Sequence, residues 1–201
     1  MPNKKVVVYI HGKSGSAAEA DHYRALFPDR EVIGFDYSAQ TPWEAQKEFA
    51  DFFESLSARA ENIFLVANSI GAYFSLCALA ETAIENAFFI SPIVDMERLI
   101  EDMMTWAGVT EGELKEKKIV KTSFGEDLSW DYLTWVRAHP VEWRVSTEIL
   151  YGEKDSLQSE NCIRAFATRF GAGVTVMKGG EHWFHTEEQM HFLDEWIRSK
   201  V

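Results

Sequence analysis

A serine, an aspartate and a histidine, the residue types that cooperate in nucleophilic catalysis, follow three separate apolar runs of this sequence. The serine is Ser69 in the segment 67–71, ANSIG, which comes directly after the apolar run 62–67. This segment has the pattern G-x-S-x-G with alanine in place of the first glycine, and the pattern marks a sharp strand-to-helix turn. Such a turn exposes the serine hydroxyl and points the first amides of the following helix at whatever reacts there. Ser69 is therefore a candidate nucleophile.

A serine hydroxyl is a poor nucleophile unless a base accepts its proton, and the base needs an acid that orients it. Asp155 lies four residues after the expected strand 148–151, in a loop that reads YGEKD. His182 follows the expected strand 173–177, in the segment GGEHWFH. Each residue therefore occupies the loop after its own strand, in the order Ser, Asp, His. We predict Ser69, Asp155 and His182 as a catalytic triad.

Alternatives exist for two of these roles. Glu153 and Asp95 also follow expected strands and are backup acids, and His185 is the rival base. The position of His185 suits the start of the last helix, which favours His182.

A reaction that develops negative charge on oxygen also needs two backbone donors. The amide of Ile70, directly after the serine, is one candidate. The second donor should come from the glycine-rich loop 11–15, HGKSG, with Lys13 as first choice and Gly12 as second. This loop lacks the G-x-x-x-x-G-K-[ST] and G-x-G-x-x-G spacings, so we do not expect a nucleotide site.

The elements that must position these residues alternate between strands and helices. Apolar runs that do not alternate with polar residues, separated by helices, are typical of a parallel sheet covered on both faces. We therefore expect a three-layer α/β/α sandwich with a six-stranded, mostly or fully parallel sheet in the order 2-1-3-4-5-6. The expected strands are residues 5–10, 31–36, 62–67, 86–90, 148–151 and 173–177, and the expected helices are 16–27, 43–59, 70–79, 160–170 and 187–200.

An insertion of about residues 95–146 interrupts this alternation and is rich in aromatic residues. It could form extra helices that cover the sheet, or a small helical cap over the carboxyl ends of the strands, where ligands bind in such folds. We favour the cap. It would contribute Trp106, Trp130 and Trp135 to a substrate pocket, together with Trp183 beside the expected base.

Composition limits the classes of partner. Apolar residues make up 46% and charged residues 26% of the 201, as in a soluble globular protein with a single domain over 1–201. The formal net charge of -12 would repel phosphate backbones and anionic lipid, so we expect neither nucleic acid nor a membrane as partner. No run approaches the ~20 apolar residues of a membrane span, and we expect a cytoplasmic protein. The sequence shows no metal-ligand spacing and no cofactor motif.

The segments YIHG, ANSIG, LYGEKD and GGEHWFH together resemble the α/β-hydrolase fold superfamily, in particular its small bacterial single-domain members. The resemblance covers nearly the whole chain. It implies the nucleophile at Ser69, the acid at Asp155, the base at His182, and oxyanion donors at Ile70 and Lys13. Alanine at position 67 departs from the usual glycine, which leaves the geometry of the turn open.

These observations predict a serine hydrolase that acts on small carboxylic esters or thioesters through an acyl-enzyme. A small-molecule acyl substrate is then the expected partner, and no cofactor is needed. A peptidase or amidase of the same fold is one alternative. A non-catalytic protein that uses the pocket to hold a small ligand is another, although all three triad members are present.

Overall fold

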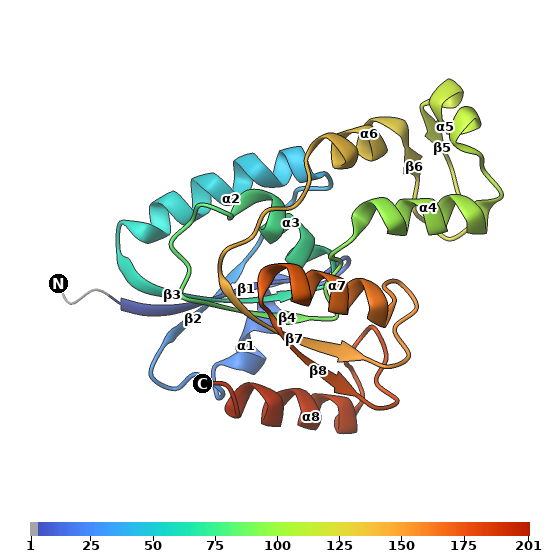
Figure 1. The fold of residues 1–201 in the computed structure, drawn as a ribbon. Coiled ribbons are helices and arrows are strands. Elements are labelled where there is room, and N and C mark those ends of the chain that lie inside the picture. Colours follow the sequence, from blue (N-terminus) through green and yellow to red (C-terminus); the bar gives the residue numbers. More distant parts are fainter. Residues whose placement is uncertain (1–3) are drawn as a thin grey trace. The chain divides into compact units, whose positions relative to one another are not determined.

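The apolar runs predicted as strands form one six-stranded sheet, in which every neighbouring pair is parallel (Figure 1). The computed structural model describes residues 4–201. The strand order is β2-β1-β3-β4-β7-β8, which confirms the predicted order. The strands are β1 (Lys4–Ile10), β2 (Glu31–Phe35), β3 (Ala60–Asn68), β4 (Asn86–Ile90), β7 (Ser146–Gly152) and β8 (Gly173–Met177).

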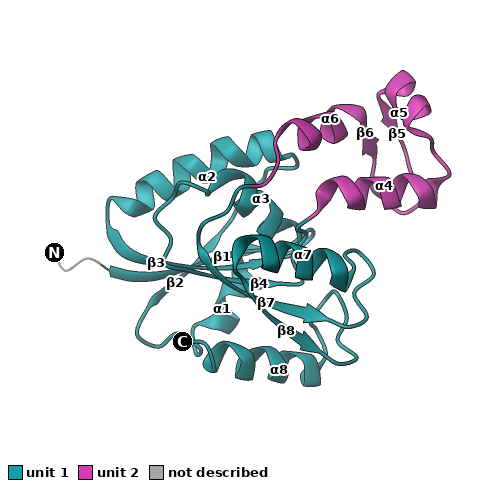
Figure 2. Cartoon of the chain, viewed as in Figure 1, with its two compact units in different colours: residues 1–94, 142–201 teal, residues 95–141 magenta. Residues whose placement is uncertain are grey.

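The chain divides into two compact units (Figure 2). Unit 1 contains the sheet and comprises the residues up to Val94 together with Glu142–Val201. Unit 2 is Asp95–Val141. The predicted insertion ended near residue 146, but Trp143 belongs to unit 1, where it packs on Phe89 and its Nε1 donates to Thr147 Oγ1 at 2.7 Å. Trp143 therefore belongs to the core that packs on the sheet and not to the insertion.

Helices cover both faces of the sheet, which explains why its strands are continuously apolar. One core cluster joins α1 (Ala20–Tyr23) and α8 (Glu187–Arg198) to alternate residues of the strands, such as Val7 and Tyr9 of β1. On the other face lie α2 (Pro42–Ser57), α3 (Ile70–Ala78) and α7 (Glu160–Phe170) (Figure 1). Val8 and Ile10 alternate with Val7 and Tyr9 along β1. They are buried and therefore face this second layer of helices.

The helix predicted over 16–27 is shorter in the structure. A 3-10 turn, η1 (Ala17–Glu19), precedes the four residues of α1, and the following residues form turns in which Leu26 and Phe27 both donate their N–H to Tyr23 O. The cause is the tight contact between η1 and β2. A Cβ added to Gly34 would lie 2.0 Å from the carbonyl oxygen of Ala17.

The sheet order creates a topological switch point between β1 and β3. From β1 the chain moves to β2 on one side, and it then returns to place β3 on the other side. The carboxyl ends of these strands are in register, with Ile10 opposite both Phe35 and Ala67. Ligands of open parallel sheets bind outside such a switch point. The loops after β1 and β3 carry Lys13 and Ser69.

Unit 2 has its own small helical core. Its elements are α4 (Met96–Ala107), α5 (Glu111–Lys117), β5 (Ile119–Val120), β6 (Leu128–Ser129) and α6 (Trp130–Ala138), with β5 and β6 antiparallel. Leu114, Leu128 and Leu133 are fully or almost fully buried. Among residues 4–201 we find no helix long and apolar enough to cross a membrane.

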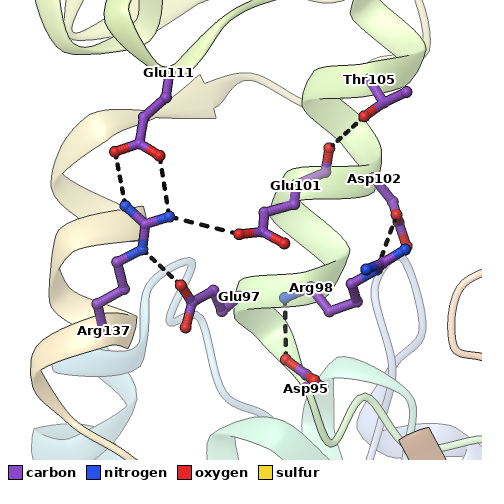
Figure 3. Close-up of polar contacts among 8 residues, drawn as sticks. All are labelled: Asp95, Glu97, Arg98, Glu101, Asp102, Thr105, Glu111 and Arg137. Carbon is purple, nitrogen blue, oxygen red and sulfur yellow. Dashed lines mark hydrogen bonds and ion pairs between the residues drawn. The ribbon is translucent and has the colours of Figure 1, made fainter. Parts of the chain in front are cut away.

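One arginine joins the three helices of unit 2 (Figure 3). Arg137 of α6 binds Glu97 of α4 through Nε at 2.6 Å, and it binds Glu111 of α5 through both terminal nitrogens at 2.9 and 3.1 Å. Glu101 completes the cluster at 3.5 Å. The hydrogen bonds that Arg137 donates to Glu111 and Glu97 raise its pKa above the usual value. A guanidinium group that binds carboxylates from two other helices fixes the positions of these helices relative to α6.

Replacing this arginine tests its role. Arg137→Met keeps the apolar stem but leaves three neighbouring carboxylates without their cation. We expect backbone hydrogen exchange in α4, α5 and α6 to accelerate about tenfold, as for a loss of about 1.4 kcal/mol, while exchange in the sheet stays unchanged. Lys117→Met removes only an exposed pair with Glu113 and is the control. Equal exchange in both variants would show that Arg137 does not organise unit 2.

Candidate active site

Ser69 lies at the turn between β3 and α3 in a conformation that side chains rarely adopt. Its φ is 50° and its ψ is -118°. Such backbone strain persists only where surrounding contacts maintain it, and it is concentrated at functional sites. Ala67 stays in the strand, opposite Ile10 and Phe89, so a residue with a Cβ fits there. The missing glycine therefore does not prevent the sharp turn.

The turn after β4 holds the backbone of Ser69 on both sides. The N–H of Ser69 donates to Ile90 O at 3.1 Å, and its carbonyl accepts from the N–H of Ile93 at 3.2 Å. Ser91, between these two residues, has a φ of 42° and donates its own N–H to Leu150 O at 2.8 Å. The strained conformation is thus hydrogen-bonded to the neighbouring strand end.

The side chains of Ser69, His182 and Asp155 form a continuous chain of contacts. Ser69 Oγ lies 2.8 Å from His182 Nε2, and His182 Nδ1 lies 2.7 Å from Asp155 Oδ2. The aspartate side chain is completely buried, and the histidine side chain is 21% exposed. Both distances are those of good hydrogen bonds. The structure brings together the three residues predicted as a triad.

Asp155 is held in place by the backbone of its own loop. Its Oδ1 accepts from the N–H of Leu157 at 2.8 Å and of Gln158 at 3.4 Å, which leaves Oδ2 for the histidine. Tyr151 supports the same loop, since its hydroxyl donates to Gln158 O at 2.9 Å. Burial, and then the charge of Asp155, raise the pKa of Tyr151 to about 12, so the phenol stays a neutral donor.

The loops that carry Asp155 and His182 are joined to each other. Lys154 donates its N–H to Gly180 O at 2.8 Å, and Gly179 donates its N–H to Glu153 Oε2 at 2.8 Å. Gly152 allows this approach, because a Cβ there would lie 2.4 Å from Glu181 O. Glu153, the predicted backup acid, therefore joins the two loops.

The other two alternatives also have different partners. His185 Nδ1 lies 2.7 Å from Trp183 O, and its ring stacks on Trp183. Asp95 caps α4 by accepting the N–H of Arg98 at 3.0 Å. Both side chains therefore have hydrogen-bond partners of their own.

Two segments that carry the predicted oxyanion donors border the serine. Ile70 is the first residue of α3, so its N–H has no acceptor within the helix. Gly12 faces Ser69 directly, since a Cβ added to Gly12 would lie 3.3 Å from Ser69 Cβ. The loop after β1, which carries Lys13, thus lies next to the serine. Ile70 and Lys13 as oxyanion donors remain a prediction that this arrangement supports.

The four tryptophans predicted for a substrate pocket have different surroundings. Trp183 is 71% exposed and lies directly after His182. Within unit 2, Trp106 is 53% exposed and meets Phe124 edge to face, while Trp130 and Trp135 are partly buried. Their role in a pocket stays a prediction. Among residues 4–201, no group of three His, Cys, Asp or Glu side chains could hold a metal ion.

No family model matches the sequence, and no curated protein matches it. Solved structures do match over nearly the whole chain. Est1E from Butyrivibrio proteoclasticus is 14% identical, with a TM-score of 0.76 over 100% of this chain and 88% of its own. Mouse alpha/beta hydrolase domain-containing protein 10 is 19% identical, with a TM-score of 0.74 over 97% and 88%.

A monoacylglycerol lipase from Paleococcus ferrophilus is 16% identical, with a TM-score of 0.65 over 99% of this chain and 97% of its own. These likenesses confirm the resemblance at the level of the fold. The chain has the α/β-hydrolase fold.

The sequence does not reveal several residues that build the site. Glu153 as a link between loops depends on the conformations of the loops after β7 and β8, which the predicted strand order does not specify. The contact between Gly12 and Ser69 depends on the same kind of information. The glycine in HGKSG is a signal for a close backbone approach, but it does not say which residue approaches.

Gly71 tests how tightly the turn is packed. A Cβ at this position would lie 2.4 Å from His11 O and 3.0 Å from Ile10 O, and backbone atoms of a sheet cannot easily move. We expect Gly71→Ala to lower the free energy of unfolding in urea by about 1–3 kcal/mol. Gly112→Ala is the control, because a Cβ at this helical position meets nothing within 4 Å. It should be neutral or stabilising.

Proposed function

We propose that this protein is a serine hydrolase that cleaves small carboxylic esters or thioesters. The observation that carries the proposal is the contact chain from Ser69 Oγ through His182 to the buried Asp155, at 2.8 and 2.7 Å. The α/β-hydrolase fold and the esterases among the solved structures that share it support the same reaction class. Because these structures are at most 18% identical to this chain, the proposed reaction rests mainly on the triad.

Each member of the triad has a defined task in this proposal. Asp155 accepts a hydrogen bond from the Nδ1–H of His182, which leaves Nε2 free to accept the serine proton. Ser69 Oγ then attacks the acyl carbonyl, and the N–H groups of Ile70 and Lys13 stabilise the oxyanion of the tetrahedral intermediate. The protonated His182 donates to the leaving alkoxide or thiolate. Water, activated by the same histidine, hydrolyses the acyl-enzyme.

An exposed indole next to His182 favours a substrate with an aromatic substituent. Trp183 follows the base in sequence, and one face of its indole is covered by His185 while most of its surface is exposed. Aromatic surfaces stack favourably on such a ring. Est1E, one of the solved structures that share this fold, has been determined with ferulic acid bound. We therefore include aryl esters among the proposed substrates.

The nucleophile can be tested by covalent labelling. A fluorophosphonate probe should label the wild-type protein, and Ser69→Ala should lose both labelling and the hydrolysis of p-nitrophenyl esters. Ser159→Ala is the matched control. Its hydroxyl caps α7 at 3.3 Å from the Cys162 N–H, so labelling should be unchanged. Wild-type protein that is neither labelled nor active on acetate, butyrate, octanoate or ferulate esters would contradict the proposal.

The acid can be tested by an isosteric change. Asp155→Asn keeps the shape of the side chain but allows its amide to donate to Nδ1, which places the histidine proton on Nε2. We expect kcat to fall about 10⁴-fold, because the histidine then has the wrong tautomer. Steady-state kinetics with a p-nitrophenyl ester measure the change. Glu153→Gln is the comparison variant and should retain most of the kcat. A similar loss of kcat in both variants would show that the acid is not Asp155 alone and would contradict this assignment.

A further inference from the structure

The loop between β1 and η1 lies next to Ser69. The far end of this loop is held by Glu19, a residue outside the loop. Gly12 faces Ser69, and Gly15 donates its N–H to Gly12 O at 3.1 Å. The last residue of the loop, Ser16, donates its N–H to Glu19 Oε1 at 3.1 Å. A Cβ added to Gly15 would lie 2.8 Å from the same carboxylate oxygen. The carboxylate of Glu19 therefore packs directly on the loop.

The second carboxylate oxygen of Glu19 is linked through Tyr9 to the residue that precedes Ser69. Glu19 Oε2 accepts a hydrogen bond from the hydroxyl of Tyr9, a residue of β1 that is 0% exposed. The same hydroxyl accepts from Asn68 Nδ2 at 2.8 Å, and Asn68 is the residue directly before Ser69. One carboxylate thus connects the end of the loop that carries Lys13 with the turn that carries Ser69.

The direction of this chain depends on the negative charge of Glu19. An ionised carboxylate can only accept, so the Tyr9 hydroxyl must donate to it and can then only accept from Asn68. Burial raises the pKa of Tyr9 above its usual value, so the hydroxyl keeps its proton. The Asn68 amide is consequently held with Nδ2 toward Tyr9, and its buried Oδ1 has no hydrogen-bond partner within residues 4–201.

We propose that Glu19 is a positioning residue for the oxyanion hole, which aligns the loop of Lys13 with the turn of Ser69 through Tyr9 and Asn68. The inference rests on the proposed function of the site. Glu19 itself touches neither Ser69 nor His182, and it acts through the backbone of the loop and the side chain of Asn68. Without its charge, the Tyr9 hydroxyl is able to donate to Asn68 Oδ1, which reverses the amide beside the nucleophile.

The test uses the rate per active site, which a merely structural role would not change. Glu19→Gln has the same shape without the charge, and the burst of p-nitrophenolate on mixing with an ester counts the folded, competent sites. We expect kcat per titrated site to fall about tenfold with KM within twofold, because a displaced donor loses part of its 10²–10³-fold contribution. Tyr9→Phe breaks the same chain at a second point and should have a similar effect.

Glu44→Gln is the matched control. Glu44 also accepts backbone N–H groups at a helix start, from Gln40 at 2.9 Å and Thr41 at 3.0 Å, and within residues 4–201 we find no hydrogen-bond chain from it to the serine. Its kcat per site should equal that of the wild type. The double variant Glu19→Gln with Tyr9→Phe should lose no more than the larger single effect, since both break one chain.

The outcomes separate the two proposals. A wild type that shows a burst, together with Glu19→Gln whose kcat per site is within twofold of it, would overturn the role of Glu19 and leave the hydrolase intact. A lower unfolding temperature with an unchanged kcat per site would have the same meaning. A wild type with no burst and no fluorophosphonate labelling would overturn the hydrolase, and the role of Glu19 with it.

Discussion

The site depends on one strained residue that two strand ends hold in place. Ser69 adopts its unusual backbone conformation because the N–H and the carbonyl bind Ile90 and Ile93, while Gly71 lets α3 begin against the backbone of His11. Strain of this kind has to be offset by the surrounding structure. The parallel register of β1, β3 and β4 provides it, because it brings three strand ends to the same level. The serine hydroxyl is then exposed toward the base.

The remaining contacts divide into two groups that meet at this serine. On one side, the loops after β7 and β8 are joined by Lys154, Glu153 and the glycines opposite them, so the acid and the base are positioned together. On the other side, the loop after β1 is held to the turn by Glu19, Tyr9 and Asn68. Each group uses backbone groups and one carboxylate. Contacts of this kind preorganise the geometry that the proposed reaction requires.

The fold was predictable because the central strands β1, β3, β4 and β7 are largely buried and read as apolar runs. The loops after β3, β7 and β8 could be identified for the same reason, and with them Ser69, Asp155 and His182. The early helix was predicted too long, because apolar spacing does not report the contact of Ala17 with Gly34. Trp143 was assigned to the insertion, because the aromatic residue of a core and that of a cap look alike in sequence. The roles of Glu153 and Glu19 depend on tertiary contacts that have no local pattern.

His182 lies in the loop that follows β8, the strand at the edge of the sheet. β8 pairs only with β7, and four of its five residues are partly exposed, in contrast to the buried strands at the centre. Local opening begins where few apolar contacts and exposed hydrogen bonds coincide. Fraying of this edge separates His182 from Ser69 while β1, β3 and β4 stay paired. The contact between His182 and Ser69 therefore depends on the least buried strand of the sheet, whereas the turn of Ser69 depends on the buried centre.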